Sequence, residues 1–69
     1  MSNCDVFTVL KAKRKSDNDY VILCHLTEND VTPWATWRSN TVDGSGDRYW
    51  GHYFYEGEED RANADFEDR

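Results

Sequence analysis

The chain has 69 residues, with 8 basic and 14 acidic side chains and a formal net charge of −6 at pH 7. A chain of this length buries only about 60% of the surface that its unfolded form exposes, so a deep, enclosed active site would take up most of its core. The acidic balance also argues against nucleic acid as a direct partner, because such binding begins with cationic side chains on phosphate groups. We therefore expect a single small domain over residues 1–69 that is not an enzyme.

The sequence predicts a folded, soluble protein of the cytoplasm that makes no membrane contact. Its longest apolar run is Val21–Cys24, whereas a membrane-spanning helix needs about 20 apolar residues. Met1 is followed by polar residues rather than by the basic and apolar regions of a signal peptide. Three Trp, four Tyr and three Phe residues indicate folding, since acidic disordered chains contain few aromatic residues.

Two strands joined by a turn are predicted in the first part of the chain. Residues 5–13 alternate between apolar and polar positions, which is the period of a strand. The two faces of this strand would carry Val6, Thr8, Leu10 and Ala12, and Phe7, Val9, Lys11 and Lys13. Polar residues 15–19 form a turn. Residues 20–26 are apolar on both faces, as expected of a central strand.

Two further strands follow a polar loop at residues 27–33. The third strand, residues 34–41, begins after Pro33, which lacks a backbone donor. The strongest turn signal is at residues 43–47, because its glycines adopt positive φ without steric cost. The fourth strand, residues 48–55, has five aromatic side chains in eight positions.

A short helix is predicted after Gly57, where β-branched residues are absent. Ala62 and Phe66 stand at i, i+4 spacing and form a narrow apolar stripe. Acidic residues in the first turn suit the positive end of the helix dipole. The fold class is therefore α+β, a four-stranded antiparallel meander with one short C-terminal helix.

One short helix covers only one face of such a sheet, which leaves the other face rich in aromatic side chains. We expect Trp34 and Trp37 on opposite faces, and Trp50 and Phe54 opposite Tyr49, Tyr53 and Tyr55. Cross-strand aromatic pairs would stabilise the sheet, and an uncovered aromatic face would bind a partner or a second copy. A homodimer is predicted for this reason. The candidate contact residues are Trp34, Trp37, Arg38, Arg48, Trp50 and Tyr53.

The predicted helix offers a second candidate surface, because the negative charge is concentrated there. Its candidate residues are Glu58, Glu59, Asp60 and Asp65. Such a row of carboxylates can bind a basic groove on another protein, or it can serve only to keep the chain soluble. The basic residues at positions 11–15 are interpreted as a solvated hairpin tip.

The two cysteines are expected to be free thiols. Pairing across the predicted hairpin places Arg14 opposite Tyr20 and Leu10 opposite Cys24. Cys4 would then lie about 20 Å from Cys24 along the sheet, whereas a disulfide needs Cα atoms within about 7 Å. Cys24 is therefore predicted to be a small core residue.

No catalytic residue, cofactor or metal site is predicted. The two Cys and two His residues lack the spacing of a zinc site. Asp43, Ser45 and Asp47 imitate the start of a calcium loop, but Arg48 and Phe54 stand where that loop needs Gly and Glu. This segment is therefore interpreted as a hairpin turn.

Three segments of the second half carry a resemblance to a known group of proteins. They are TWRSNT at 36–41, YWGHYF at 49–54, and the final A-x-A-D-F-E-D-R at 62–69. In these segments the chain resembles small uncharacterised proteins of tailed bacteriophages, in which an aromatic hairpin leads into a short acidic helix. The resemblance implies a stoichiometric inhibitor that binds a host or defence protein, and it assigns no functional residues.

Two function classes follow. The first is a non-enzymatic acidic binding module whose partner is another protein. The alternative is a self-associating protein that binds a small ligand such as a nucleotide, with the base stacked on Trp or Tyr. In that case Arg38 or Arg48 would pair with the phosphate.

Overall fold

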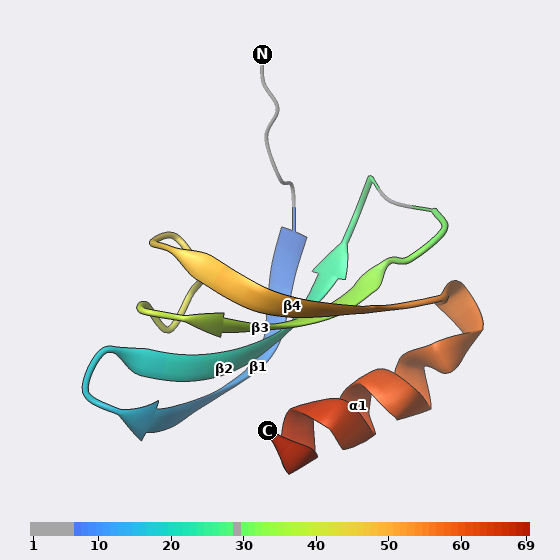
Figure 1. Ribbon diagram of the computed structural model, residues 1–69. Coiled ribbons are helices and arrows are strands. Elements are labelled where there is room, and N and C mark those ends of the chain that lie inside the picture. Colours follow the sequence, from blue (N-terminus) through green and yellow to red (C-terminus); the bar gives the residue numbers. More distant parts are fainter. Residues whose placement is uncertain (1–6, 29) are drawn as a thin grey trace.

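The computed structural model describes residues 7–28 and 30–69, and it shows one four-stranded antiparallel sheet followed by a helix (Figure 1). The strands lie in the order β1-β2-β3-β4, so each pairs with its neighbour in the sequence. The elements are β1 (Phe7–Ser16), β2 (Asp19–Leu26), β3 (Trp34–Ser39), β4 (Arg48–Phe54), the short 3-10 helix η1 (Glu56–Glu58) and α1 (Glu59–Asp68). The predicted α+β meander with a C-terminal helix is confirmed. Within the described residues, no helix is long and apolar enough to cross a membrane.

β2 is the centre of the fold because residues Val21–Cys24 are buried on both faces of the sheet. Its odd-numbered residues in this range face α1, and its even-numbered residues face away, as the alternation of a strand requires. The prediction of a central strand is therefore confirmed. The predicted pairing of Arg14 with Tyr20 is also confirmed.

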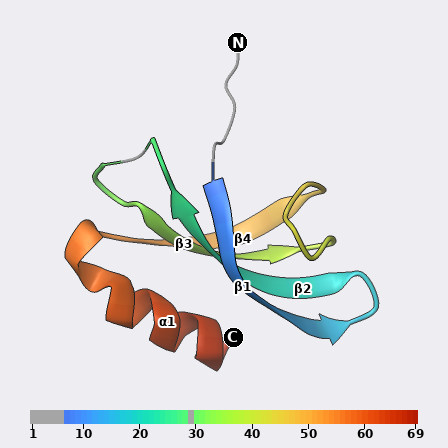
Figure 2. The same cartoon turned by 180° about the vertical axis from the view of Figure 1, so that it is seen from behind.

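α1 lies along one face of the sheet, as the two opposite views in Figures 1 and 2 show. The cluster on this side consists of Val21, Leu23, Ala62 and Phe66, bordered by Trp34 and Phe54. Ala62 and Phe66 are the i, i+4 pair that the sequence predicted. Burial of one Phe side chain contributes about 1.5–3 kcal/mol, so this stripe accounts for much of the attachment of α1.

β1 contains a β-bulge at Leu10, which shifts its pairing with β2 by one residue. Val9 lies opposite Cys24, and Lys11 lies opposite the next paired residue of β2, Leu23. The predicted pairing of Leu10 with Cys24 is therefore wrong by one position. A bulge inserts one unpaired residue, and a regular alternation of apolar and polar positions does not reveal it.

The bulge turns the second half of β1 over, so that Phe7 and Lys13 lie on opposite faces of the sheet and not on the same face as predicted. Lys13 Nζ donates to the carbonyl of Glu67 at 2.9 Å, and Lys15 donates to the carbonyl of Arg69. The last turn of α1 has no basic residue of its own. Two lysines of β1 therefore supply the positive charge that favours a helix C-terminus.

The face opposite α1 is covered by the β3–β4 loop, and the prediction of an uncovered aromatic face is wrong in this respect. The loop folds back so that Gly44, with a φ of +74°, is buried against the sheet. A Cβ atom at Gly44 would lie 2.9 Å from Cδ1 of Ile22 and 3.2 Å from the Phe7 ring. The cluster on this side consists of Ile22, Cys24, Ala35 and Trp37, bordered by Phe7, Val9 and Leu26.

The predicted turn at residues 43–47 lies in this loop and is held by side chains. The backbone N–H of Ser45 donates to Asp43 Oδ1 at 3.0 Å, and that of Asp47 donates to Asn40 Oδ1 at 3.0 Å. The bond from Ser45 lowers the pKa of Asp43. Asp43 therefore stabilises a turn, as the interpretation of this segment required.

β4 has a bulge of its own, at Trp50 and Gly51. The β3–β4 register shifts here, so that these two residues lie opposite Trp37. A Cβ atom at Gly51 would lie 2.4 Å from Nε1 of Trp37, so glycine provides the space in which that indole packs. Trp50 has a positive φ of 54°, which few residues other than glycine adopt.

Candidate functional site

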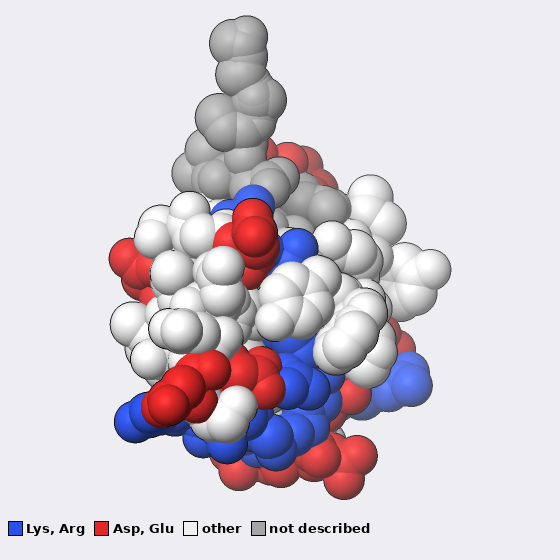
Figure 3. Space-filling model, turned by 60° about the vertical axis from the view of Figure 1, so that its left-hand side comes forward, with Lys and Arg blue, Asp and Glu red and all other residues white. Residues whose placement is uncertain are grey.

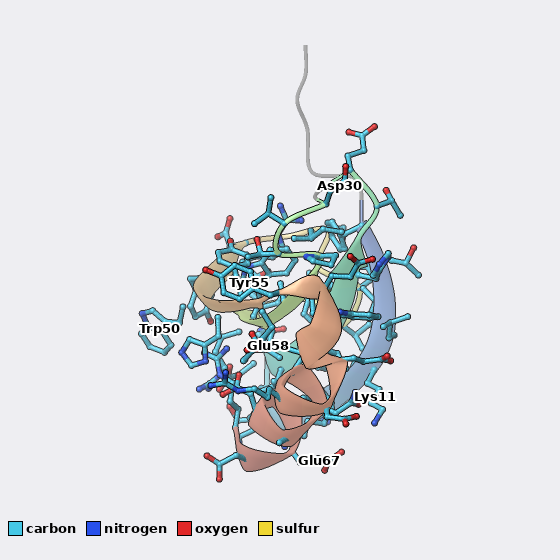
Figure 4. All side chains as sticks on the ribbon, turned by 90° about the vertical axis from the view of Figure 1, so that its right-hand side faces the viewer. Lys11, Asp30, Trp50, Tyr55, Glu58 and Glu67 are labelled. Atoms are coloured by element: carbon cyan, nitrogen blue, oxygen red, sulfur yellow. The ribbon has the colours of Figure 1, made fainter. Side chains whose placement is uncertain are left out.

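The exposed aromatic side chains gather along β4 and just beyond its end. Trp50 is 68% exposed, Tyr55 61%, Tyr53 55% and Tyr49 37%. We call these four residues the β4 aromatic edge, because β4 is an outermost strand of the sheet. Figure 4 shows the Trp50 ring projecting away from the ribbon. Aromatic side chains dominate the binding energy of many protein interfaces, so this edge is the first candidate contact surface.

The backbone of Trp50 is strained at the bulge of β4. A positive φ of 54° in a residue other than glycine costs about 1–3 kcal/mol. The indole packs edge-on against Tyr49, with 5.2 Å between the ring centroids, and the Arg38 guanidinium lies 5.7 Å from the indole centroid. Arg38 is in turn held by Asp19, with its Nε 3.0 Å from Oδ1. These contacts orient the indole without covering it.

Two predicted contact residues, Trp34 and Trp37, serve the fold instead. The half-buried Trp34 donates from Nε1 to the carbonyl of Glu56 at 2.9 Å. Trp37 is only 6% exposed, and its Nε1 donates to the phenolic oxygen of Tyr53 at 3.3 Å. The stabilising interpretation of the aromatic residues therefore applies to Trp34 and Trp37, and the partner-binding interpretation stays a prediction. Trp34 and Trp37 stabilise the sheet, while Trp50 and Tyr53 are accessible to a partner.

The two arginines considered for phosphate binding are engaged within the fold. Arg38 forms an ion pair with Asp19, whose hydrogen bond raises the pKa of the guanidinium. Arg48 donates to the carbonyl of Gly44 at 2.9 Å and lies 4.6 Å from the centroid of the Phe7 ring. A phosphate group would have to compete with these contacts. The arrangement therefore does not favour the nucleotide hypothesis.

The acidic candidates at the start of α1 have different roles. Glu58 accepts hydrogen bonds from the backbone N–H of Tyr55 at 3.1 Å and from Nη1 of Arg61 at 2.7 Å. The bond from Tyr55 is the main reason why the pKa of Glu58 is lowered. Glu59 and Asp60 are exposed. Glu58 thus fixes the entry into the helix, and Glu59 and Asp60 remain available for a partner.

Asp65 is the centre of a polar cluster that joins α1 to β3 and β4. Its Oδ2 accepts a hydrogen bond from Thr36 Oγ1 at 2.5 Å and lies 3.0 Å from Nδ1 of His52. Arg69 donates to the carbonyl and the hydroxyl of Thr36 at 3.0 and 3.1 Å, and to the carbonyl of Trp50 at 2.6 Å. We call Thr36, His52, Asp65 and Arg69 the Asp65 cluster.

The Asp65 cluster is structural, and it favours the charged form of its carboxylate. Partial burial raises the pKa of Asp65, but hydrogen bonds from Thr36 and His52 and the charge of Arg69 outweigh burial, so the net pKa is lowered. Thr36 is fully buried, and its hydroxyl donates to Asp65 while accepting from Arg69. This hydroxyl is therefore not accessible to a substrate, and the cluster does not form a nucleophilic site.

An open groove of about 450 Å³ lies between α1 and β4. Its lining residues are Phe54, Arg61, Ala64, Asp65 and Asp68, and we call it the α1–β4 groove. A smaller hollow of about 240 Å³ is lined by His25, Leu26, Thr27, Asp30, Pro33 and Glu56. Of these two hollows in the described residues, the α1–β4 groove is the one with a lining residue from β4. It therefore extends the candidate contact surface toward the helix.

Charged side chains are segregated on the surface. On the side shown in Figure 3, Lys and Arg form a band beside uncharged side chains, with Asp and Glu at its borders. In and beside the β1–β2 hairpin, Arg14 pairs with Asp17 and Arg38 pairs with Asp19. α1 carries five acidic residues and one arginine, so its surface is acidic.

The predicted free thiol at Cys24 is confirmed. Burial raises its pKa to about 12, although the charge of Arg48 acts in the opposite direction. A buried thiol with so high a pKa is chemically inert at neutral pH. Cys4 lies outside the described residues. Among residues 7–28 and 30–69, no three His, Cys, Asp or Glu side chains form a group that could hold a metal ion.

Sequence reasoning missed the Asp65 cluster and two members of the β4 aromatic edge, Tyr49 and Tyr55. The cluster depends on the β3–β4 register, which places Thr36 opposite His52, and on the position of α1 beneath this pair. No pattern in the sequence reports that position. Comparison with known proteins adds no relative, since no protein-family model, curated protein or solved structure matches the chain.

Proposed function

We propose that the chain is a protein-binding module without catalytic activity of its own, and that it holds its partner through the β4 aromatic edge. The observation that carries this proposal is the concentration of four exposed aromatic side chains on one outer strand and its end. The other large apolar residues that are exposed in the described chain are Leu10, Val31 and Val42, which come from separate segments. Exposed aromatic residues gathered on one strand are typical of an interaction site, whereas single scattered apolar residues are not.

The acidic surface of α1 has a supporting role in this proposal. Its exposed acidic residues are Glu59, Asp60, Glu67 and Asp68. Exposed carboxylates steer a basic partner and raise its association rate, but they contribute little affinity by themselves. The expectation that the partner is a host protein, and that binding inhibits it, rests on the resemblance to bacteriophage proteins alone.

The test is affinity capture with a variant of the edge and a matched control. The double variant Trp50→Ala and Tyr53→Ala removes two exposed rings, while Leu10→Ala with Val42→Ala removes exposed apolar groups elsewhere. A partner bound by the native chain and by the control is expected to be lost by the edge variant, since such anchors contribute on the order of 2 kcal/mol or more each. Equal capture of that partner by all three proteins would contradict the proposal.

Salt separates the aromatic contact from an acidic one. Binding through the edge is expected to persist in half-molar salt, because burial of aromatic surface is not screened. Neutral replacements at Glu59, Asp60, Glu67 and Asp68 are expected to slow association with little effect on dissociation. These replacements leave Glu58 and Asp65 in place, since both stabilise the fold. Loss of binding at modest salt in the native chain would instead place the contact on α1.

A further inference from the structure

The two outer strands of the sheet differ in their capacity to accept another strand. Both outer strands contain a bulge, but β1 also carries Lys11, Lys13 and Lys15 in its second half, and such charged side chains hinder pairing with another chain. β4 has no lysine, and its exposed residues are aromatic. Because aromatic residues fit a pleated surface well, β4 is the edge suited to receiving an additional strand.

The bonds within the fold define which part of β4 is available. The carbonyl of Trp50 already accepts a hydrogen bond from Arg69 at 2.6 Å, and the positive φ of Trp50 ends the regular ladder. At the other end, the N–H of Tyr55 donates to Glu58 at 3.1 Å. Between these points lies the stretch Gly51–Phe54, whose outer side faces no strand of the described chain.

The surroundings of this stretch indicate the charge of an incoming segment. On the helix side, the α1–β4 groove is lined by Phe54, Ala64 and the exposed carboxylate of Asp68. The Asp65 carboxylate in the same lining is bound to Thr36 and His52, and the one lining cation, Arg61, is paired with Glu58. The remaining acids of α1 extend the same sign beyond the groove. Side chains of an added strand that point toward α1 would enter this groove. Lysine and arginine meet these requirements, because an apolar stem can pack on Phe54 while the charged end reaches a carboxylate.

A second copy of the chain fits these surroundings less well. Each copy carries a net charge of −6, so two copies paired through β4 would bring their acidic helices to the same interface. Charge complementarity therefore selects a partner of the opposite sign.

From these observations we infer that β4 binds an extended, basic segment of a partner protein as an additional strand along Gly51–Phe54. The basic side chains of that segment occupy the α1–β4 groove, and Tyr53 contacts its side chains on the opposite face. This inference rests on the proposed function and adds the mode of binding and the chemistry of the partner. Backbone pairing supplies the affinity. The contacts of the added side chains with the α1–β4 groove on one face and with Tyr53 on the other supply the selectivity.

The experiment uses a short peptide of alternating Lys and Val residues as the probe, and one of alternating Glu and Val as its control. The full chain is labelled with 15N, and amide hydrogen exchange is followed with and without each peptide. We expect the Lys peptide to slow the exchange of alternate amides within Gly51–Phe54 by about tenfold or more, as new strand pairing does. The Glu peptide should leave these amides unchanged.

A charge reversal tests the groove. At about 0.15 M salt, Asp68→Lys is expected to weaken binding of the Lys peptide by about tenfold. Asp47→Lys, the same change in the β3–β4 loop, should leave binding within about twofold, because Asp47 does not line the groove and exposed charges are screened over about 8 Å. Equal effects of the two substitutions would overturn the assignment of the groove.

Three results would overturn the inference. The first is that the Lys peptide does not bind. The second is that it binds without slowing the exchange of the amides of Gly51–Phe54. The third is that these amides are already protected in the protein alone, together with a doubled mass in sedimentation. The last would make the added strand a second copy. In each case, a partner whose capture depends on Trp50 and Tyr53 would still support the proposed function, so the two failures are distinguishable.

Discussion

At the scale of single residues, position decides the role of a side chain more than its type does. Asp65 and Asp68 are two aspartates of the same short helix. Asp65 lies within hydrogen-bonding distance of Thr36 and His52, whereas Asp68 is exposed at the edge of the α1–β4 groove. One carboxylate therefore attaches the helix to the sheet, and the other is free to meet a partner.

Replacement of Asp65 is expected to change how stability depends on pH. The pKa of Asp65 is lower in the folded chain than its ordinary value of 3.8, so the unfolded state binds the proton first as the pH falls. This contribution to stability is complete above 3.8 and is lost as the pH falls through the lowered value. Asp65→Asn should cost about 1 kcal/mol at neutral pH and reduce the loss in acid.

Urea unfolding across the acid range measures this effect. The matched control is Asp68→Asn, which removes the same charge from the same helix and should change the free energy of unfolding by no more than about 0.5 kcal/mol. Equal stability curves for the two variants would show that the Asp65 cluster contributes nothing to the fold.

At the scale of elements, the β3–β4 loop acts as a second cover for the sheet. α1 covers one face with Ala62 and Phe66, and the loop covers the other through the close approach of Gly44 to Ile22 and Phe7. This division explains how so small a chain buries apolar side chains on both faces of one sheet.

The variant Gly44→Ala is expected to disturb this cover. Its Cβ would meet Ile22 Cδ1 at 2.9 Å, and the φ of +74° strains any residue other than glycine. Overpacking together with this strain should lower the free energy of unfolding by about 1–3 kcal/mol. Gly57→Ala is the control, because nothing lies within 4 Å of its Cβ position. A Gly44→Ala variant as stable as the control would mean that the loop is not packed on the sheet.

The elements themselves were predictable from the sequence, but their irregularities were not. Alternation and turn residues predicted all four strands and the helix, because side-chain periodicity follows directly from backbone geometry. The bulges at Leu10 and at Trp50 and Gly51 were missed, since each depends on what the neighbouring strand offers. Two consequences of the bulges were therefore not predicted. The lysines of β1 lie on the opposite face of the sheet from Phe7, and Trp50 is exposed. The sequence therefore pointed to aromatic contacts in general, and register decided which of them are accessible.

At the scale of the whole molecule, Cys24 reports on the cover opposite α1. It is buried in the cluster with Ile22 and Trp37, which α1 does not touch. In a Cys4→Ser variant, Cys24 is the single thiol of the chain. Its reaction with a thiol reagent should be about 10³-fold slower than in the unfolded chain, since global unfolding is needed to expose it.

The control for this measurement carries Cys4→Ser, Cys24→Ala and Ser45→Cys, which moves the thiol to an exposed loop position. It should react at nearly the rate of an unfolded thiol. Rapid labelling of Cys24 under native conditions would mean that the cover opens locally while the remainder of the chain stays folded.

The asymmetry between the two outer strands has a consequence for the form of any assembly. Lys13 and Lys15 donate to carbonyls at the C-terminal end of α1, so their positive charge lies beside the β1 edge. The bulge at Leu10 also interrupts the pairing of that strand. A sheet that can be extended on one side only cannot propagate, because the unit that joins it leaves no second template on this chain. If β4 receives a strand as inferred above, we expect the molecule to end strand pairing. Complexes of fixed stoichiometry, rather than filaments, are then expected in sedimentation even at high concentration.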